Sequence, residues 1–168
     1  MNLTSIKLLI LDVDGVLTDG RVIGGAEGEP GKSFCVQDGS AIKRWQACGG
    51  KVALLSGRSE RCVALRAEEL GIRCVHLGVG EKLAVYEAIL KSTGHTDAET
   101  SYVGDDQPDL GPLSRCGFPV AVANATPVVK RASAYVTRRK GGEGAVAEVI
   151  EFMLRRRAAR LSKCTDRT

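Results

Sequence analysis

The chain has 168 residues, 43% of them hydrophobic, a length that suits one compact domain with a single core. No stretch approaches the roughly 20 consecutive apolar residues of a membrane span, and Met1 leads into a strand pattern rather than a signal peptide, so we expect a cytoplasmic protein with no membrane partner. The formal charge of +4 belongs to the end of the chain, because residues 155–168 hold six basic residues and one acid, which leaves a nearly neutral body and predicts no nucleic-acid partner.

Short apolar runs typical of strands buried on both faces alternate with segments whose apolar residues recur at helical spacing. Such alternation is typical of a parallel sheet covered by helices on both faces. The sequence therefore predicts an α/β fold, a Rossmann-like three-layer sandwich with a central parallel sheet. In chain order, the expected strands are residues 6–11, 52–55, 73–77, 101–103, 120–123 and 134–136, and the expected helices are residues 38–47, 59–70, 81–91, 107–115 and 145 to about 157.

Residues 21–36 interrupt this alternation directly after the first strand. They show two short strand patterns around the glycine-rich segment 24–31, which is typical of a protruding β-hairpin with a long turn. No linker divides the remainder of the chain. We therefore expect residues 1–158 to form a single domain and residues 159–168 to form a flexible basic tail, either a solvated helix end or an arm for an acidic partner.

Residues able to carry chemistry follow the expected strands at the point where each strand ends. In an open parallel sheet, functional groups gather at the carboxyl ends of the strands, so these side chains are expected to share one crevice. They are Asp12 and Asp14 after the first strand, Ser56, Gly57 and Arg58 after the second, Lys82 ahead of the third helix, and Asp105, Asp106 and Asp109 after the fourth strand.

The excess of carboxylates in this crevice indicates a bound cation. The candidate ligands are hard oxygen donors, with no nearby histidine and no cysteine pair, which favours Mg²⁺ over zinc. The six cysteines of the chain are scattered without CxxC pairs, and we interpret them as reduced structural thiols. We therefore predict Mg²⁺ as the cofactor.

These residue types fit the transfer of a phosphoryl group. Asp12 is suited to attack a phosphate monoester and form an aspartyl-phosphate, and Asp14 to protonate the leaving alcohol and later to deprotonate the hydrolytic water. Ser56, the backbone amides around Gly57, and Lys82 are suited to hold the phosphoryl oxygens. The planar guanidinium of Arg58 suits the carboxylate of a 2-keto acid.

Four motifs in this order resemble those of the haloacid dehalogenase superfamily of phosphatases. They are Asp12-Val13-Asp14-Gly15-Val16, Ser56-Gly57-Arg58, Lys82 and Gly104-Asp105-Asp106-Gln107-Pro108-Asp109. Longer strings narrow the resemblance to a capless subclass that dephosphorylates sugar-acid phosphates. The resemblance covers about residues 5–155. These strings are residues 12–20, the hairpin end Val36-Gln37-Asp38-Gly39, Arg66 with Leu70-Gly71-Ile72, and residues 141–146.

The resemblance implies a ring-like homotetramer in which the hairpin, in place of a cap domain, covers the active site of the neighbouring subunit. It implies that Mg²⁺ is held by Asp12, by the backbone carbonyl of Asp14 and by Asp105. It also implies that the glycine-rich segment 141–144 folds over the site, so that Gly142 contacts the substrate. Arg66 and Asp109 are expected to contact the substrate as well.

Three functions remain open from the sequence. The first is a phosphatase for the 8-phosphate of an eight-carbon deoxy sugar acid, in lipopolysaccharide biosynthesis. The second is a phosphatase for the 9-phosphate of a related nine-carbon keto sugar acid, against which Arg58 argues mildly. The third is a non-catalytic assembly or phospho-acceptor domain, which the presence of every expected catalytic residue disfavours.

Overall fold

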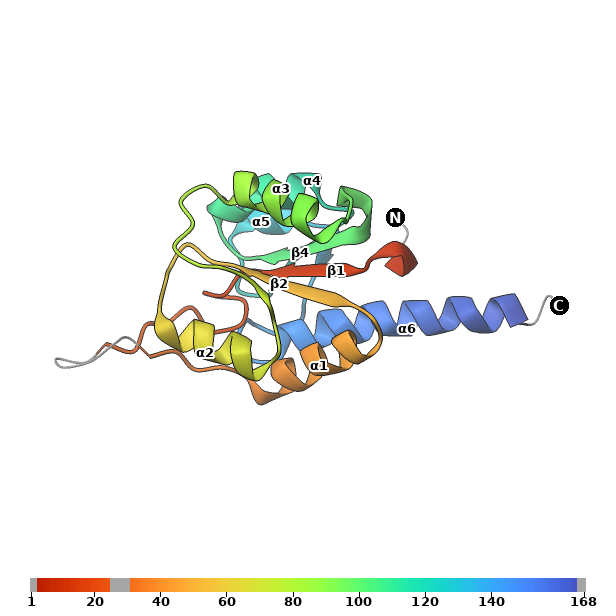
Figure 1. The fold of residues 1–168 in the computed structure, drawn as a ribbon, viewed down its shortest axis with the longest axis horizontal. Coiled ribbons are helices and arrows are strands. Elements are labelled where there is room, and N and C mark those ends of the chain that lie inside the picture. Colours follow the sequence, from red (N-terminus) through yellow and green to blue (C-terminus); the bar gives the residue numbers. More distant parts are fainter. Residues whose placement is uncertain (1–2, 25–30, 166–168) are drawn as a thin grey trace.

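The computed structural model describes residues 3–24 and 31–165 of the chain. Six parallel strands form one sheet in the order β3-β2-β1-β4-β5-β6, with β1 between β2 and β4 (Figure 1). The strands are β1 (Leu8–Leu11), β2 (Lys51–Leu55), β3 (Cys74–His76), β4 (Thr100–Gly104), β5 (Phe118–Ala121) and β6 (Tyr135–Val136). All six predicted strands are confirmed, with ends that differ by at most two residues.

Helices cover both faces of the sheet (Figure 1). One face carries α1 (Val36–Ala47), α2 (Arg61–Glu69) and α6 (Ala145–Thr165), and the other carries α3 (Lys82–Thr93), α4 (Leu110–Arg115) and α5 (Pro127–Ala132). Short 3-10 turns span Leu3–Ser5, Asp97–Glu99 and Gln107–Asp109. The predicted α/β fold, a three-layer sandwich around a parallel sheet, is therefore confirmed.

The central strand β1 anchors the core. All four of its side chains, Leu8 to Leu11, are completely buried, as expected of a strand with helices on both faces. Burial of each such side chain contributes about 1.5–3 kcal/mol relative to exposure. Since β1 pairs in register with both β2 and β4, its end fixes the position of the residues that follow it.

The segment that was predicted as a hairpin leaves the body of the protein after the first strand (Figure 1). Ile23 and Gly31 exchange two antiparallel backbone hydrogen bonds, of 3.1 and 2.9 Å, but they form an isolated bridge rather than regular strands. The turn at residues 25–30 lies outside the described residues. The predicted end of the hairpin, Val36, instead begins α1.

Two helices differ from the prediction. α5 was not predicted, although Pro127 at its first turn is a common helix-start signal. α6 extends to Thr165 rather than ending near Arg157, so helical backbone continues into the predicted tail. The single-domain boundary at residue 158 and the flexibility of the tail stay predictions. Among the described residues, no helix is both long and apolar enough to cross a bilayer.

Candidate active site

Three neighbouring strands end at one cavity. Asp12 follows β1, Ser56 follows β2 and Asp105 follows β4, so the strand order alone brings these residues together. The cavity has a volume of about 300 Å³. Its lining residues come from all four predicted motifs and from the loops beside them: Asp12, Asp14, Gly20, Gly57, Arg58, Val79, Gly80, Lys82, Asp105, Asp106, Pro108 and Asp109.

Negative charge is concentrated on one side of this cavity. Carboxylate oxygens of Asp12, Asp105 and Asp109 all lie within 4.8 Å of one another. Burial and the nearby charge of Asp109 raise the pKa of Asp12 well above its usual value, although Lys82 acts in the opposite direction. Burial, together with Asp109, also raises the pKa of Asp105 to about 6. The three carboxylates therefore exceed the positive charge that Lys82 supplies to them.

Lys82 is the cation of this cluster. It is the first residue of α3 and its side chain is 6% exposed. Its Nζ lies 2.9 Å from Asp12 Oδ1 and 2.7 Å from Asp109 Oδ1. Burial alone would lower the pKa of Lys82, but the two carboxylates outweigh burial and raise it. Lys82 therefore stays protonated beside the proposed nucleophile.

Asp109 is surrounded by donors from three directions. Its Oδ1 accepts hydrogen bonds from Lys82 Nζ and from the Tyr102 hydroxyl, each at 2.7 Å. Its Oδ2 accepts the backbone N–H groups of Asp105 and Asp106 at 3.0 and 3.2 Å. Asp109 thus holds Lys82 and the loop after β4 in place. Its predicted contact with substrate stays a prediction.

The donor set of this cluster fits a hard divalent cation. Asp12 Oδ1 is buried and has no hydrogen bond of acceptable geometry, although Lys82 lies close to it. Because both Asp109 oxygens already accept internal hydrogen bonds, Asp12 and Asp105 are the carboxylates best placed to bind an ion. Carboxylate oxygens in such number suit Mg²⁺. The Asp14 side chain pairs with Lys32, and the predicted ligation by its backbone carbonyl stays a prediction.

Gly15 explains why a glycine follows the Asp12-Val13-Asp14 motif. Its φ is +81°, a conformation that glycine adopts without steric cost. A Cβ at this position would lie 2.1 Å from Asp105 Oδ2. Glycine therefore lets the loop after β1 approach the carboxylate that follows β4.

The loop after β2 supplies the opposite side of the cavity. Ser56 is 1% exposed, and its hydroxyl oxygen accepts the backbone N–H of Arg58 at 3.2 Å. Gly57 and Arg58 line the cavity, whereas Ser56 is not among the lining residues. This arrangement brings the predicted backbone and guanidinium groups to the edge of the site, and the predicted contact of the Ser56 hydroxyl with phosphate stays a prediction.

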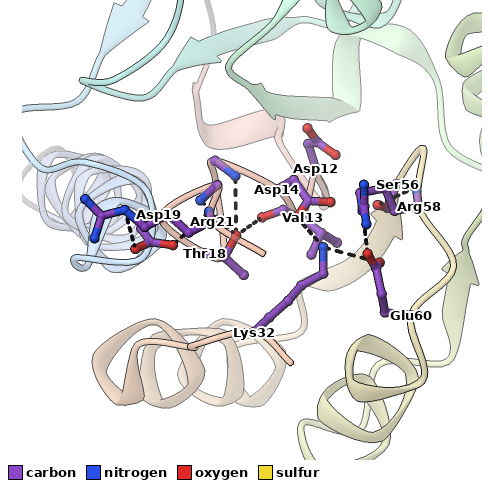
Figure 2. Close-up of polar contacts among 12 residues, drawn as sticks. Asp12, Val13, Asp14, Thr18, Asp19, Arg21, Lys32, Ser56, Arg58 and Glu60 are labelled. Carbon is purple, nitrogen blue, oxygen red and sulfur yellow. Dashed lines mark hydrogen bonds and ion pairs between the residues drawn. The ribbon is translucent and has the colours of Figure 1, made fainter. Parts of the chain in front are cut away.

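Two charged residues that the sequence did not indicate complete this side of the site. Lys32, from the segment between the Ile23–Gly31 bridge and α1, reaches Asp14 Oδ1 and also lies 3.3 Å from Glu60 Oε2 (Figure 2). Glu60 in turn accepts a hydrogen bond from Arg58 Nε. No sequence signal identifies these pairs, because Lys32 lies 18 residues from Asp14 and its position depends on how the segment folds back.

Arg66 and Gly142 are not among the residues that line the cavity. Arg66 forms an ion pair of 2.7 Å with Glu69, donates to the Cys35 carbonyl at 3.4 Å, and lies 5.8 Å from the centre of the Phe34 ring. Gly142 donates its N–H to the Val16 carbonyl at 3.1 Å, which places it against the loop after β1. Their predicted substrate contacts stay predictions.

Comparisons with known proteins agree with this geometry. A family model described as haloacid dehalogenase-like hydrolase matches residues 78–150, which include Lys82 and the loop after β4. The 3-deoxy-D-manno-octulosonate 8-phosphate phosphatase of Haemophilus influenzae is 42% identical over 152 residues, which cover 90% of this chain and 84% of that protein.

Solved structures of similar proteins share the whole fold. One is the same phosphatase from Moraxella catarrhalis, in complex with a magnesium ion, a phosphate ion and a molecule of KDO (3-deoxy-D-manno-octulosonate). It superimposes with a TM-score of 0.90 at 36% identity, and the match covers 96% of this chain and 95% of that one. The cobalt-bound phosphatase from Haemophilus influenzae gives a TM-score of 0.91 at 40% identity, with coverage of 94% and 92%.

Proposed function

The chain belongs to the family of the 3-deoxy-D-manno-octulosonate 8-phosphate phosphatases, within the haloacid dehalogenase-like hydrolases, and we propose that it hydrolyses this sugar-acid phosphate to KDO and phosphate. The observation that carries the proposal is the cluster of three side chains in which Asp12 and Asp105 follow the adjoining strands β1 and β4, and Lys82 begins α3 beside them. A nucleophile, a phosphate-binding cation and a metal ligand lie there within reach of one phosphoryl group.

The reaction begins with Asp12. One of its carboxylate oxygens attacks phosphorus, the bond from phosphorus to the sugar oxygen breaks, and an aspartyl-phosphate forms. Lys82, 2.9 Å from Asp12 Oδ1, is placed to neutralise charge on the transferring phosphoryl oxygens. The Ser56 hydroxyl and the backbone amides of the Ser56–Arg58 loop are suited to bind the remaining oxygens.

Asp14 is the proposed acid–base residue. Its protonated carboxyl gives a proton to the departing sugar alcohol. The resulting carboxylate then removes a proton from the water that attacks the aspartyl-phosphate, which releases phosphate and restores both residues. Asp14 lines the same cavity as Asp12 and lies two residues further along the chain, in the turn after β1, as this division of roles requires.

Magnesium is the proposed cofactor, held by Asp12, by the backbone carbonyl of Asp14 and by Asp105. When bound, it neutralises phosphate charge and aligns the ester with the attacking carboxylate. Two observations support this assignment. Asp12 Oδ1 is buried without a hydrogen bond of acceptable geometry, and carboxylate oxygens of Asp12, Asp105 and Asp109 lie within 4.8 Å of one another.

Arg58 is the proposed contact for the carboxylate of the sugar acid. It lies on the cavity edge opposite Asp105, and its side chain is 52% exposed, so a substrate can reach it. A planar guanidinium binds a carboxylate through two parallel hydrogen bonds. The nine-carbon keto sugar acid 9-phosphate is the alternative substrate, and the names of the relatives favour the eight-carbon acid.

Assembly and location complete the proposal. We propose a homotetramer in which the segment around the Ile23–Gly31 bridge covers a neighbouring active site, and this is supported by the exposed apolar side chains Val22 and Ile23. We also propose that the enzyme acts in the cytoplasm, within lipopolysaccharide biosynthesis. The reduced thiols Cys48 and Cys74, both in the described part of the chain, are consistent with a reducing compartment.

The test is a Mg²⁺-dependent assay of phosphate release from a panel of phosphate esters. We expect the kcat/KM for 3-deoxy-D-manno-octulosonate 8-phosphate to exceed that for the nine-carbon 9-phosphate and for sugar phosphates without a carboxylate. Equal values across the panel would contradict the substrate assignment. An absence of turnover on every ester, with Mg²⁺ present, would support a non-catalytic domain instead.

A further inference from the structure

Glu60 lies between two cations at the rim of the site (Figure 2). It is the residue that precedes α2, and its side chain is only 6% exposed. One carboxylate oxygen, Oε1, accepts a hydrogen bond from Arg58 Nε, and the other, Oε2, lies 3.3 Å from Lys32 Nζ. A shielded carboxylate that contacts two cations from different segments fixes the position of both.

The contact with Arg58 leaves its binding surface available. Because this bond uses Nε, it does not occupy the two terminal amino groups of the guanidinium. Those groups form the fork that recognises a carboxylate in two parallel bonds. Arg58 is otherwise half-exposed on a long, flexible side chain, and ordering such a side chain costs rotamer entropy. Glu60 therefore lowers the entropic cost of ordering the Arg58 side chain when the substrate binds.

The contact with Lys32 balances the charge. The Lys32 side chain is fully shielded and also pairs with Asp14, so basic and acidic side chains alternate along the series Arg58, Glu60, Lys32 and Asp14. Because the Glu60 carboxylate also pairs with Lys32, it neutralises the positive charge of Arg58 less than a carboxylate that pairs with Arg58 alone. Burial acts to raise the pKa of Glu60, but Arg58 and Lys32 together lower it, so Glu60 stays ionised.

We propose that Glu60 is a positioning residue that acts through Arg58 to set the preference of the enzyme for phosphate esters that carry a carboxylate. This inference rests on the proposed function, in which Arg58 binds the carboxylate of the sugar acid. The ion pairs of Glu60 are with Arg58 and Lys32, and neither Asp12 nor Asp105 is among its partners in the described residues. Its effect is therefore expected in KM for a carboxylated substrate rather than in the phosphoryl-transfer step.

The first experiment compares the wild-type enzyme with Glu60→Gln on two substrates. Loss of a charge-assisted hydrogen bond is expected to raise KM for 3-deoxy-D-manno-octulosonate 8-phosphate about tenfold, with kcat within about threefold of wild type. For p-nitrophenyl phosphate, which has no carboxylate, KM is expected to change by less than about twofold, because it makes no use of the bond. Glu68→Gln, on the exposed face of α2, is the matched control and should behave as wild type.

The second experiment tests whether Glu60 acts through Arg58. In an Arg58→Ala background, Glu60→Gln is expected to change KM for the sugar-acid phosphate by less than about twofold, since the group that it positions is gone. Glu60→Asp keeps the charge but is one methylene shorter, and we expect an intermediate KM. It serves as the test variant if thermal unfolding shows that Glu60→Gln is not folded.

The outcomes separate this inference from the function on which it rests. Equal losses on both substrates, or a full further loss in the Arg58→Ala background, overturn the role of Glu60. If the wild type prefers the sugar-acid phosphate and Glu60→Gln retains that preference in full, only the role of Glu60 is overturned. A wild-type enzyme with no such preference overturns the proposed function and this inference together.

Discussion

The Lys82 ammonium and the Asp109 carboxylate meet at 2.7 Å, and both side chains are almost fully shielded from water. The pair links the start of α3 to the loop after β4, and it lies directly beside Asp12. Asp109 also accepts the Tyr102 hydroxyl and the amides of Asp105 and Asp106, so one side chain fixes a proposed phosphate-binding cation and a proposed metal ligand at once.

Asp109→Asn should therefore impair catalysis through the loss of its contacts with Lys82 and with the loop after β4. The amide keeps the shape of the side chain but loses the charge that holds Lys82, and one oxygen acceptor becomes a donor that faces existing donors. We expect kcat to fall by about 100-fold or more, in line with the loss of a preorganised electrostatic contact. Steady-state kinetics with circular dichroism as a folding check measure this. Glu87→Gln, on the surface of α3, is the control, and near-normal kcat in Asp109→Asn would contradict the assignment.

Asp12→Asn should separate activity from stability. Without the attacking carboxylate, turnover is expected to be lost. Burial and the charge of Asp109 raise the pKa of Asp12, so an ionised Asp12 destabilises the metal-free fold. Replacing the carboxylate with an amide should therefore raise the Tm, by about 2–4 °C for each kcal/mol of stability gained. Thermal unfolding in a chelator measures the second effect. Full activity in this variant would exclude Asp12 as the nucleophile.

Magnesium should stabilise the folded protein through Asp105. At a free concentration of 100 times Kd, binding to the native state alone adds about 2.7 kcal/mol. We expect Mg²⁺ to raise the Tm of the wild type and to have little effect on Asp105→Asn. Asp97→Asn, remote from the cluster, should keep the full Mg²⁺ response. An unchanged response in Asp105→Asn would mean that the ion binds elsewhere.

The position of the site was predictable because it depends on local patterns and one topological rule. Asp12, Ser56 and Asp105 each follow a short apolar run, and parallel strands present their carboxyl ends at one edge. The helix α5 was missed because six residues give too short a periodic signal to distinguish from a loop.

The contacts that order the site were not predictable, because they join residues far apart in the chain. Lys32 reaches Asp14 and Glu60 only after the segment beyond the Ile23–Gly31 bridge folds back, and no periodic pattern encodes that path. The predicted contact of Asp109 with the substrate stays a prediction. Its hydrogen bonds with Tyr102 and Lys82 were not predicted, because these partners come from other elements of the fold.

Asp38 provides a pH-dependent contribution to stability outside the catalytic cluster. It lies in the first turn of α1 and accepts the backbone N–H of Ala147, near the start of α6, at 2.7 Å. Burial raises its pKa from 3.8 to about 6, although the amides of α6 and Arg139 act to lower it. The folded protein therefore binds this proton more tightly than the unfolded chain does.

The sign of the effect follows from that difference. Between pH 4 and pH 6 the native state holds more protons at Asp38 than the unfolded state, so this residue makes the free energy of unfolding fall as the pH rises, by roughly 3 kcal/mol in total. Asp38→Asn keeps an oxygen acceptor for Ala147 and cannot titrate. We expect the free energy of unfolding of the wild type, minus that of Asp38→Asn, to decrease from pH 4 to pH 6 and to level off above it. Urea unfolding of both proteins at each pH measures this difference, and a constant value would show that Asp38 titrates normally in the folded protein.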